Sequence, residues 1–155
     1  MEDSDYLNKI ITKLSNIYNT PLFMPHCTLW SKVKLAQSQL CSIIETSIKG
    51  IKPFSIKVTG SAYSQSYSKT LFLNLEKNKS IYLLYDRIQN ELSNNFHDQF
   101  DPHISLIYNK NMNESDKLHF IKTIDIKNTF FMDTMVLNKS GDKIEKWEVM
   151  NRFYL

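Results

Sequence analysis

The chain carries one short pattern twice. Pro-His-x-Thr/Ser occupies residues 25–28 and 102–105, about half the chain apart, and apolar residues follow each copy. Of the four histidines, only His26 and His103 lie in this pattern. Residues two apart on a strand face the same side of a sheet, so each copy presents an imidazole and a hydroxyl together. The repeat predicts two matching halves, each contributing one motif strand to a shared site.

Apolar periodicity predicts the elements around the motifs. We expect Ser4 to cap the first helix and Ser80 the third, while Gly50 ends the second helix and Gly60 ends a strand. A turn at residues 140–142 should join the last two strands. The predicted helices cover 4–18, 36–48, 80–92 and part of 111–124, and the predicted strands cover 23–30, 54–58, 71–75, 103–108, 130–137 and 146–153.

This order of elements predicts an α+β fold, because helices and strands alternate without strict βαβ units. The length of 155 residues suits one domain with one sizeable core. We therefore expect a single domain, residues 1–155, made of two pseudo-symmetric lobes. Antiparallel sheets should line a central cleft, with helices outside.

Charge and cysteine content narrow the class of protein. The formal net charge is only +3, which tolerates an anionic nucleotide or oligonucleotide but is not typical of a dedicated duplex nucleic-acid binder. Cys27 and Cys41 form neither a disulfide framework nor a zinc-site spacing. The N-terminal residues are acidic and no apolar stretch follows them, so we expect no signal peptide and a cytoplasmic location. Oligomeric state cannot be inferred from these features.

The residue types in the repeat suit metal-free cleavage of a phosphate ester. An imidazole, with an unperturbed pKa of ~6.5, can serve as base or acid near neutral pH. The hydroxyls of Thr28 and Ser105 can donate to the non-bridging oxygens, where charge accumulates. A cyclic phosphate is the natural substrate because its leaving oxygen stays tethered. No metal-ligand cluster is evident in the sequence, so no cofactor or metal is expected.

Several residues keep two interpretations at this stage. Trp30 shares a parity with His26 and Thr28, so it either stacks on a base or belongs to the core; Tyr63 and Tyr67, in a polar stretch, are further base-stacking candidates. Cys27, between the two motif residues, is a weaker candidate nucleophile. His97 and His119 lie outside the repeated pattern and are expected to be surface residues. For His26 and His103 there is also a structural alternative, in which they only cap hydrogen bonds at a sheet edge.

The segments 23–29 (Phe-Met-Pro-His-Cys-Thr-Leu) and 100–108 (Phe-Asp-Pro-His-Ile-Ser-Leu-Ile-Tyr) resemble the 2H phosphoesterase superfamily, and more specifically its plant and fungal cyclic phosphodiesterase branch. The resemblance implies that His26 and His103 are the acid/base pair, with His103 as base and His26 as acid. It also implies phosphate binding by three residues: Thr28, Ser105 and Tyr108.

Substrates implied by the resemblance are 2′,3′-cyclic nucleotides and ADP-ribose 1″,2″-cyclic phosphate. Relatives elsewhere in the superfamily process RNA ends, or, in viruses and bacteria, degrade cyclic or 2′,5′-linked oligonucleotide signals. A third alternative is a module that binds a nucleotide without cutting it, although both motif histidines are intact.

The chain departs from the family pattern in two places. Family members open with an apolar strand, whereas here the first helix starts almost at once, so one sheet is expected to lack a strand. Strict alternation would also put Tyr108 beside Leu106 on the core side of its strand. A bulge, or the end of the strand, would be needed to bring Tyr108 to the His103 side.

Overall fold

The computed structural model describes residues 2–92, 100–141 and 143–155. His97 and part of the predicted turn at 140–142 lie outside these residues. The chain divides into two compact units. The first, called the motif unit here, comprises Met1–Thr28, Lys57–Glu76 and Pro102–Phe130; the second unit comprises Leu29–Ile56, Lys77–Asp101 and Phe131–Leu155.

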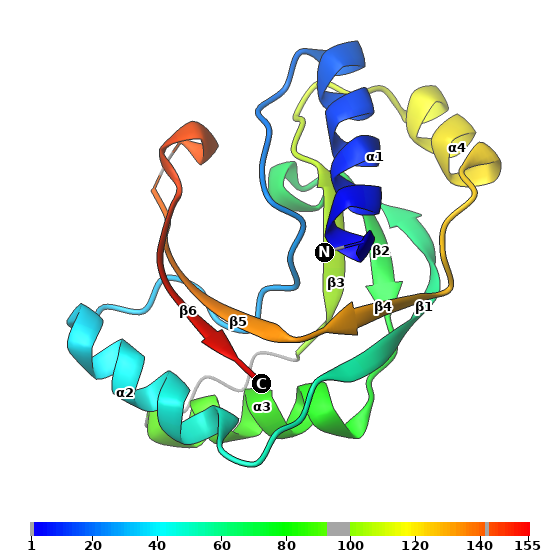
Figure 1. Cartoon of the computed structure of the whole chain (residues 1–155). Coiled ribbons are helices and arrows are strands. Elements are labelled where there is room, and N and C mark those ends of the chain that lie inside the picture. The colour runs from blue at the N-terminus through cyan, green and yellow to red at the C-terminus, as the bar shows by residue number, and fades with distance from the viewer. Residues whose placement is uncertain (1, 93–99, 142) are drawn as a thin grey trace. The chain divides into compact units, whose positions relative to one another are not determined.

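Both motifs therefore belong to the same unit, although they lie half the chain apart. Its main feature is a sheet in the order β3-β2-β1-β4, in which β2 pairs antiparallel with both β1 and β3 (Figure 1). The ends of β1 and β4 extend beyond the unit's boundaries. The elements are α1 (Glu2–Tyr18), β1 (Phe54–Tyr63), the 3-10 turn η1 (Tyr67–Lys69), β2 (Leu71–Leu75), β3 (His103–Ile107), α4 (Glu114–Thr123) and β4 (Thr129–Met132).

The helix α1 lies against β3 and supplies one side of the motif unit's core (Figure 1). Leu7, Ile11 and Leu14 recur at helical spacing and are all at least 95% buried. On the sheet, Leu73 and Ile104 are equally buried and directly paired. Burial of each such side chain stabilises the fold by roughly 1.5–3 kcal/mol. The face of the sheet that carries Leu73 and Ile104 therefore forms the core.

The second unit contains two helices and a two-stranded sheet. Its elements are α2 (Gln37–Ile48), α3 (Lys79–Glu91), β5 (Thr134–Lys139), the 3-10 turn η2 (Ile144–Lys146) and β6 (Glu148–Tyr154). The antiparallel pair β5-β6 contacts α2, and α2 packs against α3. Arg87 on α3 joins the helices by donating to the Ser47 and Lys49 carbonyls at 2.9 and 2.8 Å.

No helix in the described part of the chain has the length and hydrophobicity needed to cross a bilayer.

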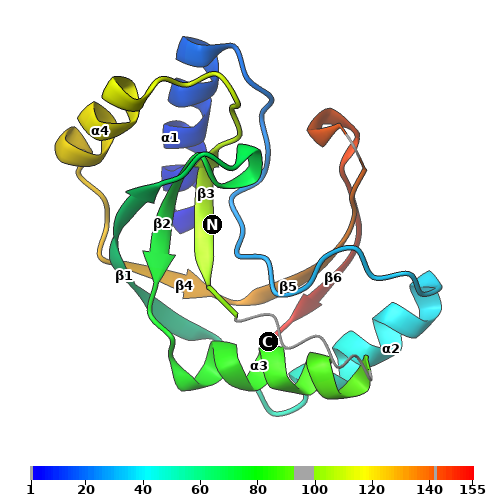
Figure 2. The same ribbon diagram turned by 180° about the vertical axis from the view of Figure 1, so that it is seen from behind.

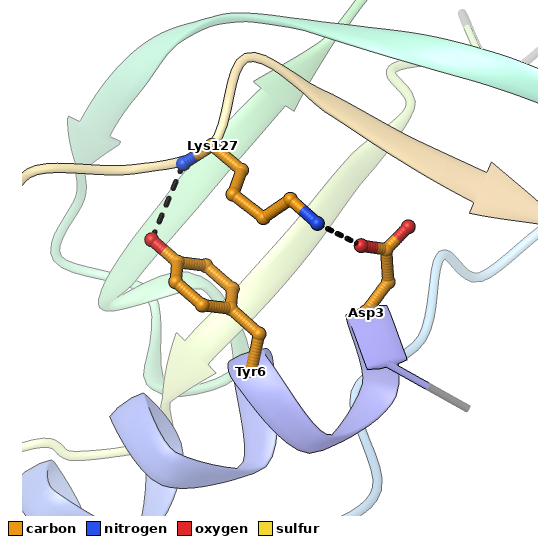
Figure 3. Close-up of polar contacts among 3 residues, drawn as sticks. All are labelled: Asp3, Tyr6 and Lys127. Carbon is orange, nitrogen blue, oxygen red and sulfur yellow. Dashed lines mark hydrogen bonds and ion pairs between the residues drawn. The ribbon is translucent and has the colours of Figure 1, made fainter.

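The start of α1 is fastened to the segment that precedes β4 (Figure 3). Lys127 Nζ lies 2.5 Å from an Asp3 carboxylate oxygen, and this hydrogen bond raises the pKa of Lys127. Tyr6 Oη donates to the Asp125 carbonyl at 3.0 Å and accepts from the Lys127 backbone N–H at 3.2 Å. The contacts are exposed, so we assign them a role in fixing the position of the helix end rather than a large stabilisation.

Several predicted element ends are wrong. The helix α1 begins at Glu2, so Ser4 lies inside it; Glu2, Asp3 and Asp5 favour the positive end of the helix dipole and extend the helix past Ser4. Asn78, not Ser80, caps α3, because its side chain accepts the Ile81 N–H at 3.1 Å.

Two predicted strands also have different bounds. The strand β1 continues beyond Gly60 to Tyr63. Its register against β2 shifts between Val58 and Gly60, where Thr59 is the extra residue, and Gly60 itself pairs with Asn74. The predicted strand over 130–137 is instead two strands, β4 and β5, which belong to different sheets.

The largest error concerns the first motif, which was predicted to lie on a strand over 23–30. Only Cys27 pairs with another strand, through an isolated antiparallel bridge to Ile104. Pro21 and Pro25 lack the N–H that a regular ladder requires, and Lys32 has a φ of 59° that turns the chain away from extended geometry. One bridge is nevertheless enough to fix which way the motif residues face.

Candidate active site

The bridge between Cys27 and Ile104 sets the two motifs against each other. In an antiparallel pair, residues on either side of a bridge face each other in reverse order, so His26 lies opposite Ser105 and Thr28 lies opposite His103. Opposed side chains are typically ~5 Å apart at Cβ. All four project from the face of the sheet opposite Cys27 and Ile104. Each imidazole is thereby placed beside the hydroxyl of the other motif.

His26 is oriented by its own segment. Its Nδ1 lies 2.6 Å from the Met24 carbonyl oxygen, which can only accept, so Nδ1 carries the hydrogen. In the neutral ring this places the basic lone pair on Nε2. The edge of the Phe23 ring also packs against His26, with centroids 6.2 Å apart. The local chain thus fixes both the tautomer and the direction of the imidazole.

His103 is supported by β2. The register pairs it with Asn74 and pairs Ser105 with Phe72, so Asn74 and Phe72 share the face of the motif residues. The Phe72 ring contacts His103 edge-on, at 5.6 Å between centroids. Lys69 Nζ lies over the Phe72 ring, 4.2 Å from its centroid. His103 is therefore held on an apolar support beside a cation.

A β-bulge in β3 brings Tyr108 to the same face. Phe72 pairs with Ser105 whereas Leu71 pairs with Ile107, so Leu106 is the extra residue. Ser105 and Ile107 consequently face opposite sides, and Tyr108 returns to the side of Ser105. Strict alternation would have put Tyr108 on the core side of its strand. The bulge instead brings Tyr108 to the His103 side, as the family resemblance requires.

Tyr108 and Ser105 form one hydroxyl cluster. Burial raises the pKa of Tyr108, while a hydrogen bond with Ser105 opposes this shift and the neighbouring Tyr67 adds to it. The phenol thus stays protonated across the neutral range and remains a donor. Ser105 Oγ also donates to the Ser68 carbonyl at 2.8 Å. The Tyr108 ring stacks on Phe23, with centroids 4.3 Å apart, which joins the second motif to the first.

Tyr108→Phe should isolate the contribution of this phenol. Phe keeps the stack on Phe23 and removes only the hydroxyl, so we expect about a tenfold lower kcat, equivalent to roughly 1.4 kcal/mol, with the midpoint of thermal unfolding nearly unchanged. Steady-state kinetics and a melting curve check this. An unchanged kcat would show that Tyr108 is only a packing residue.

The η1 turn lies against β3 (Figure 2). It is fixed by a fully buried threonine. Thr70 Oγ1 accepts the Asn109 N–H at 3.0 Å and lies 2.9 Å from the Asn109 carbonyl and 3.0 Å from the Tyr67 carbonyl. Lys117, only 2% exposed, adds a hydrogen bond from Nζ to the Ser64 carbonyl at 3.0 Å. The carbonyl of Ser68, which meets Ser105, is thus positioned from two sides.

Thr70→Val should lower the free energy of unfolding by about 1–3 kcal/mol, because the half-buried Asn109 backbone groups would lose their hydrogen bonds to the fully buried Thr70 hydroxyl. Urea denaturation measures the change. Thr123→Val, at an exposed threonine whose Oγ1 donates to the His119 carbonyl within α4, is the matched control and should cost much less. Equal losses in the two variants would contradict the role given to Thr70.

Three predicted base-stacking residues have different positions. Tyr67, 37% exposed, packs against Tyr108 at 5.9 Å between centroids, so it lies at the edge of the site. Tyr63 pairs with Leu71 and so faces the opposite side of the sheet, where its hydroxyl donates to Glu114 and this bond raises its pKa. Trp30 belongs to the second unit and stacks on Tyr85 at 5.2 Å. Of the two tyrosines, which both belong to the motif unit, Tyr67 is the one on the side of the motif residues.

Sequence reasoning missed four residues of this face: Phe23, Lys69, Phe72 and Asn74. Phe72 and Asn74 alternate with leucines in β2, a signal that was available once β2 was paired with the second motif strand. Lys69 had no signal, since its placement depends on the η1 turn. His119 is exposed on α4, and Cys27 faces the core side of its bridge.

Comparison with protein families assigns the fold and the class of chemistry. Residues 2–155 match the model of a family described as cyclic phosphodiesterase-like proteins. The chain belongs to this family. The cyclic phosphodiesterase-like family is part of the 2H phosphoesterases, so both the predicted superfamily and the α+β fold class are confirmed. The family is one of phosphoesterases, which gives the reaction class without the substrate.

Solved structures agree with the family assignment. The protein TT0787 of Thermus thermophilus superposes with a TM-score of 0.68 at 16% identity, covering 99% of this chain and 92% of that one. E. coli LigT complexed with 3′-AMP gives a TM-score of 0.64 at 11% identity, covering 97% and 91%. At these identities the likeness concerns the fold. Comparison with curated proteins found no significant match.

Potential metal ligands are dispersed over the described part of the chain. In residues 2–92, 100–141 and 143–155, no group of three or more His, Cys, Asp or Glu side chains is arranged to hold an ion. The chemical groups found near the motif residues are imidazoles, hydroxyls and the ammonium groups of Lys69 and Lys110. These groups can exchange protons and bind an anion.

Proposed function

We propose that this chain is a metal-independent phosphodiesterase that opens nucleotide cyclic phosphates. The observation that carries the proposal is the bridge at Cys27 and Ile104, since it sets His26 opposite Ser105 and Thr28 opposite His103 on one face. Two imidazoles and two hydroxyls around one position match the requirements of hydrolysis: a base, an acid and donors for the non-bridging oxygens. The substrates favoured are 2′,3′-cyclic nucleotides and ADP-ribose 1″,2″-cyclic phosphate.

In the proposed reaction, His103 takes a proton from water as the water oxygen bonds to phosphorus. The bond from phosphorus to one ribose oxygen breaks, and His26 gives its proton to that leaving oxygen from Nε2, because Nδ1 is held by the Met24 carbonyl. The product is a phosphomonoester with a free hydroxyl beside it. Thr28 and Tyr108 donate to the non-bridging oxygens as their charge increases, and Ser105 does so when its hydroxyl hydrogen turns from the Ser68 carbonyl to the phosphate.

A second candidate substrate is a cyclic or 2′,5′-linked oligonucleotide. The exposed Tyr67 ring supports it, because it packs against Tyr108 and has Lys110 Nζ 5.7 Å from its centroid, an arrangement that suits a stacked base and a phosphate. Trp30 remains a prediction for a base contact, whereas Tyr63 lies on the opposite face of the sheet from the motif residues and is no longer proposed for that role. We also propose that residues 1–155 form a single domain and that the protein is located in the cytoplasm.

A substrate panel tests the proposal. The protein is incubated, with EDTA present, with 2′,3′-cyclic nucleotides, ADP-ribose 1″,2″-cyclic phosphate, cyclic dinucleotides and 2′,5′-oligoadenylate, and products are identified by mass. We expect at least one small cyclic phosphate to be opened. E. coli LigT binds 3′-AMP in its solved complex, which supports a nucleotide monophosphate as the product class. Saturable binding without product after long incubation would instead indicate a binding module.

A further inference from the structure

Phe23 lies in the irregular segment that leads into the first motif. Its apolar neighbours Leu22 and Met24 are 56% and 46% exposed, whereas Phe23 is half-buried. The Phe23 ring stacks on Tyr108, with centroids 4.3 Å apart and an angle of 10° between the planes. It also meets the His26 ring, at 6.2 Å between centroids and 80° between planes. One side chain therefore contacts both the imidazole of the first motif and the phenol that follows the second motif.

The contact with Tyr108 depends on the β-bulge of β3. Because Leu106 is the extra residue, the Tyr108 ring lies on the face that carries Ser105 and not on the core side. The bulge thus places a flat aromatic surface beside the first motif, and Phe23 packs on it in a stacked geometry that aromatic rings favour. The position of Phe23 is therefore set by the strand that carries the other motif.

At least two contacts restrain the His26 ring. Its Nδ1 lies 2.6 Å from the Met24 carbonyl oxygen, and the Phe23 ring stands nearly perpendicular to the imidazole. The first contact selects the tautomer, and the second limits rotation of the imidazole about its bond to Cβ. The bridge at Cys27 fixes the backbone after His26, while Phe23 restrains the side chain from the preceding segment. These contacts together set the direction of Nε2, the atom proposed to give up the proton.

We propose that Phe23 is a positioning residue that directs the His26 imidazole toward the leaving oxygen, with the Tyr108 ring as its support. This role rests on the proposed phosphodiesterase function and adds to it a residue outside both motifs. A general acid acts only when it is aligned with the oxygen that it protonates, and a misplacement on the order of 1 Å can cost about 10²-fold in rate. In this role Phe23 touches no reacting atom and acts through His26.

Two other roles make different predictions. If Phe23 only buries apolar surface, its replacement lowers the midpoint of thermal unfolding while kcat is kept. If the Phe23 ring instead stacks on the base of the substrate, its replacement raises KM. That increase should be larger for an adenine than for a cytosine, because the larger base offers more area for stacking.

The test compares wild type with Phe23→Leu, Phe23→Tyr and Leu22→Ala on 2′,3′-cyclic AMP and 2′,3′-cyclic CMP. Phe23→Leu keeps an apolar side chain without a ring, Phe23→Tyr keeps the ring, and Leu22→Ala shortens an exposed side chain of the same segment. We expect Phe23→Leu to lower kcat about tenfold on both substrates, with a smaller change in KM. Phe23→Tyr should stay within about threefold of wild type because it keeps the stack, and Leu22→Ala should match wild type.

A double-mutant cycle shows whether the loss acts through His26. Adding Phe23→Leu to His26→Ala should lower the remaining kcat by less than about twofold, because the group that Phe23 positions is already absent. A second pair of variants removes the support instead and gives the answer if Phe23→Leu does not fold. Tyr108→Leu, which lacks the ring under Phe23, should lose several-fold more kcat than Tyr108→Phe, which keeps that ring.

A second measurement requires no turnover. In protein with isotope-labelled histidine, NMR correlations between ring protons and ring nitrogens identify the tautomer of His26, whose signals are assigned by their loss in His26→Ala. We expect the Nδ1–H form in wild type and a mixture of both neutral forms in Phe23→Leu.

Four outcomes would each overturn the inference: wild-type kcat in Phe23→Leu, a loss confined to KM, losses that multiply in the cycle with His26→Ala, or the same tautomer populations in wild type and Phe23→Leu. An inactive wild type would count against the proposed function, and the tautomer comparison would then decide the role of Phe23.

Discussion

Replacing either His26 or His103 with alanine should lower kcat by about 10²–10⁴-fold, the range for loss of a general acid or base. Each imidazole has a separate proton transfer to perform, so neither can replace the other. The wild-type enzyme should show a bell-shaped dependence of rate on pH, and each variant should lose one limb of it. Steady-state kinetics on a 2′,3′-cyclic nucleotide measure both effects.

The control is His119→Ala, at an exposed position on α4 that is outside the motifs. It should keep full activity. Circular dichroism and a melting curve should show the alanine variants at 26 and 103 to be folded. Full activity in either motif variant, with the fold intact, would remove that histidine from the reaction and with it the proposed mechanism.

The second large effect concerns the two hydroxyls. Thr28→Val and Ser105→Ala should each lower kcat by about 10²–10³-fold, as the loss of one donor to a developing oxyanion does elsewhere. Thr28 is exposed, so its replacement should leave stability unchanged. Ser105 also contacts the Ser68 carbonyl, and Ala at that position should therefore cost some stability as well.

Combining the two hydroxyl variants separates a shared target from independent ones. If both hydroxyls bind one phosphate, the double variant should lose less than the product of the single losses, because the remaining contacts already fail to hold the phosphate in place. Thr123→Val serves as the control hydroxyl outside the site. Losses that appear only in KM would indicate substrate binding without transition-state stabilisation.

The sequence alone predicted the superfamily, through the resemblance of its two motif segments, and it also predicted the fold class and most elements of the motif unit. The elements could be predicted because the apolar positions of α1 and the alternation of β2 are strong periodic signals, and β3 begins at His103 as expected. Pairing each histidine with its own hydroxyl on one face required only the period of a strand.

Features that depend on contacts between distant segments were missed. The bulge at Leu106 exists only in the register of β3 against β2, so no pattern within residues 103–108 predicts it. Tyr63 was expected to be a base-stacking candidate, but β1 extends through it and turns its ring away from the motifs. The first motif is held by a single bridge, because the prolines before it exclude a longer ladder.

The division into units was also beyond local patterns. Each unit is drawn from three separate stretches of chain, and one unit holds both motifs. A sequence repeat suggests halves that follow each other along the chain. Units assembled from alternating stretches of the chain leave no periodic signal in the sequence. The same is true of Lys69, whose position follows from the hydrogen bonds of the η1 turn.

The most direct test of the central claim is hydrolysis of 2′,3′-cyclic AMP by EDTA-treated protein in water labelled with oxygen-18. The proposed mechanism predicts a single AMP phosphomonoester that carries one heavy oxygen on its phosphate, formed by wild type and not by the His26→Ala or His103→Ala variants. A product without the label, formation of product that requires an added metal, or equal turnover by the variants would contradict it.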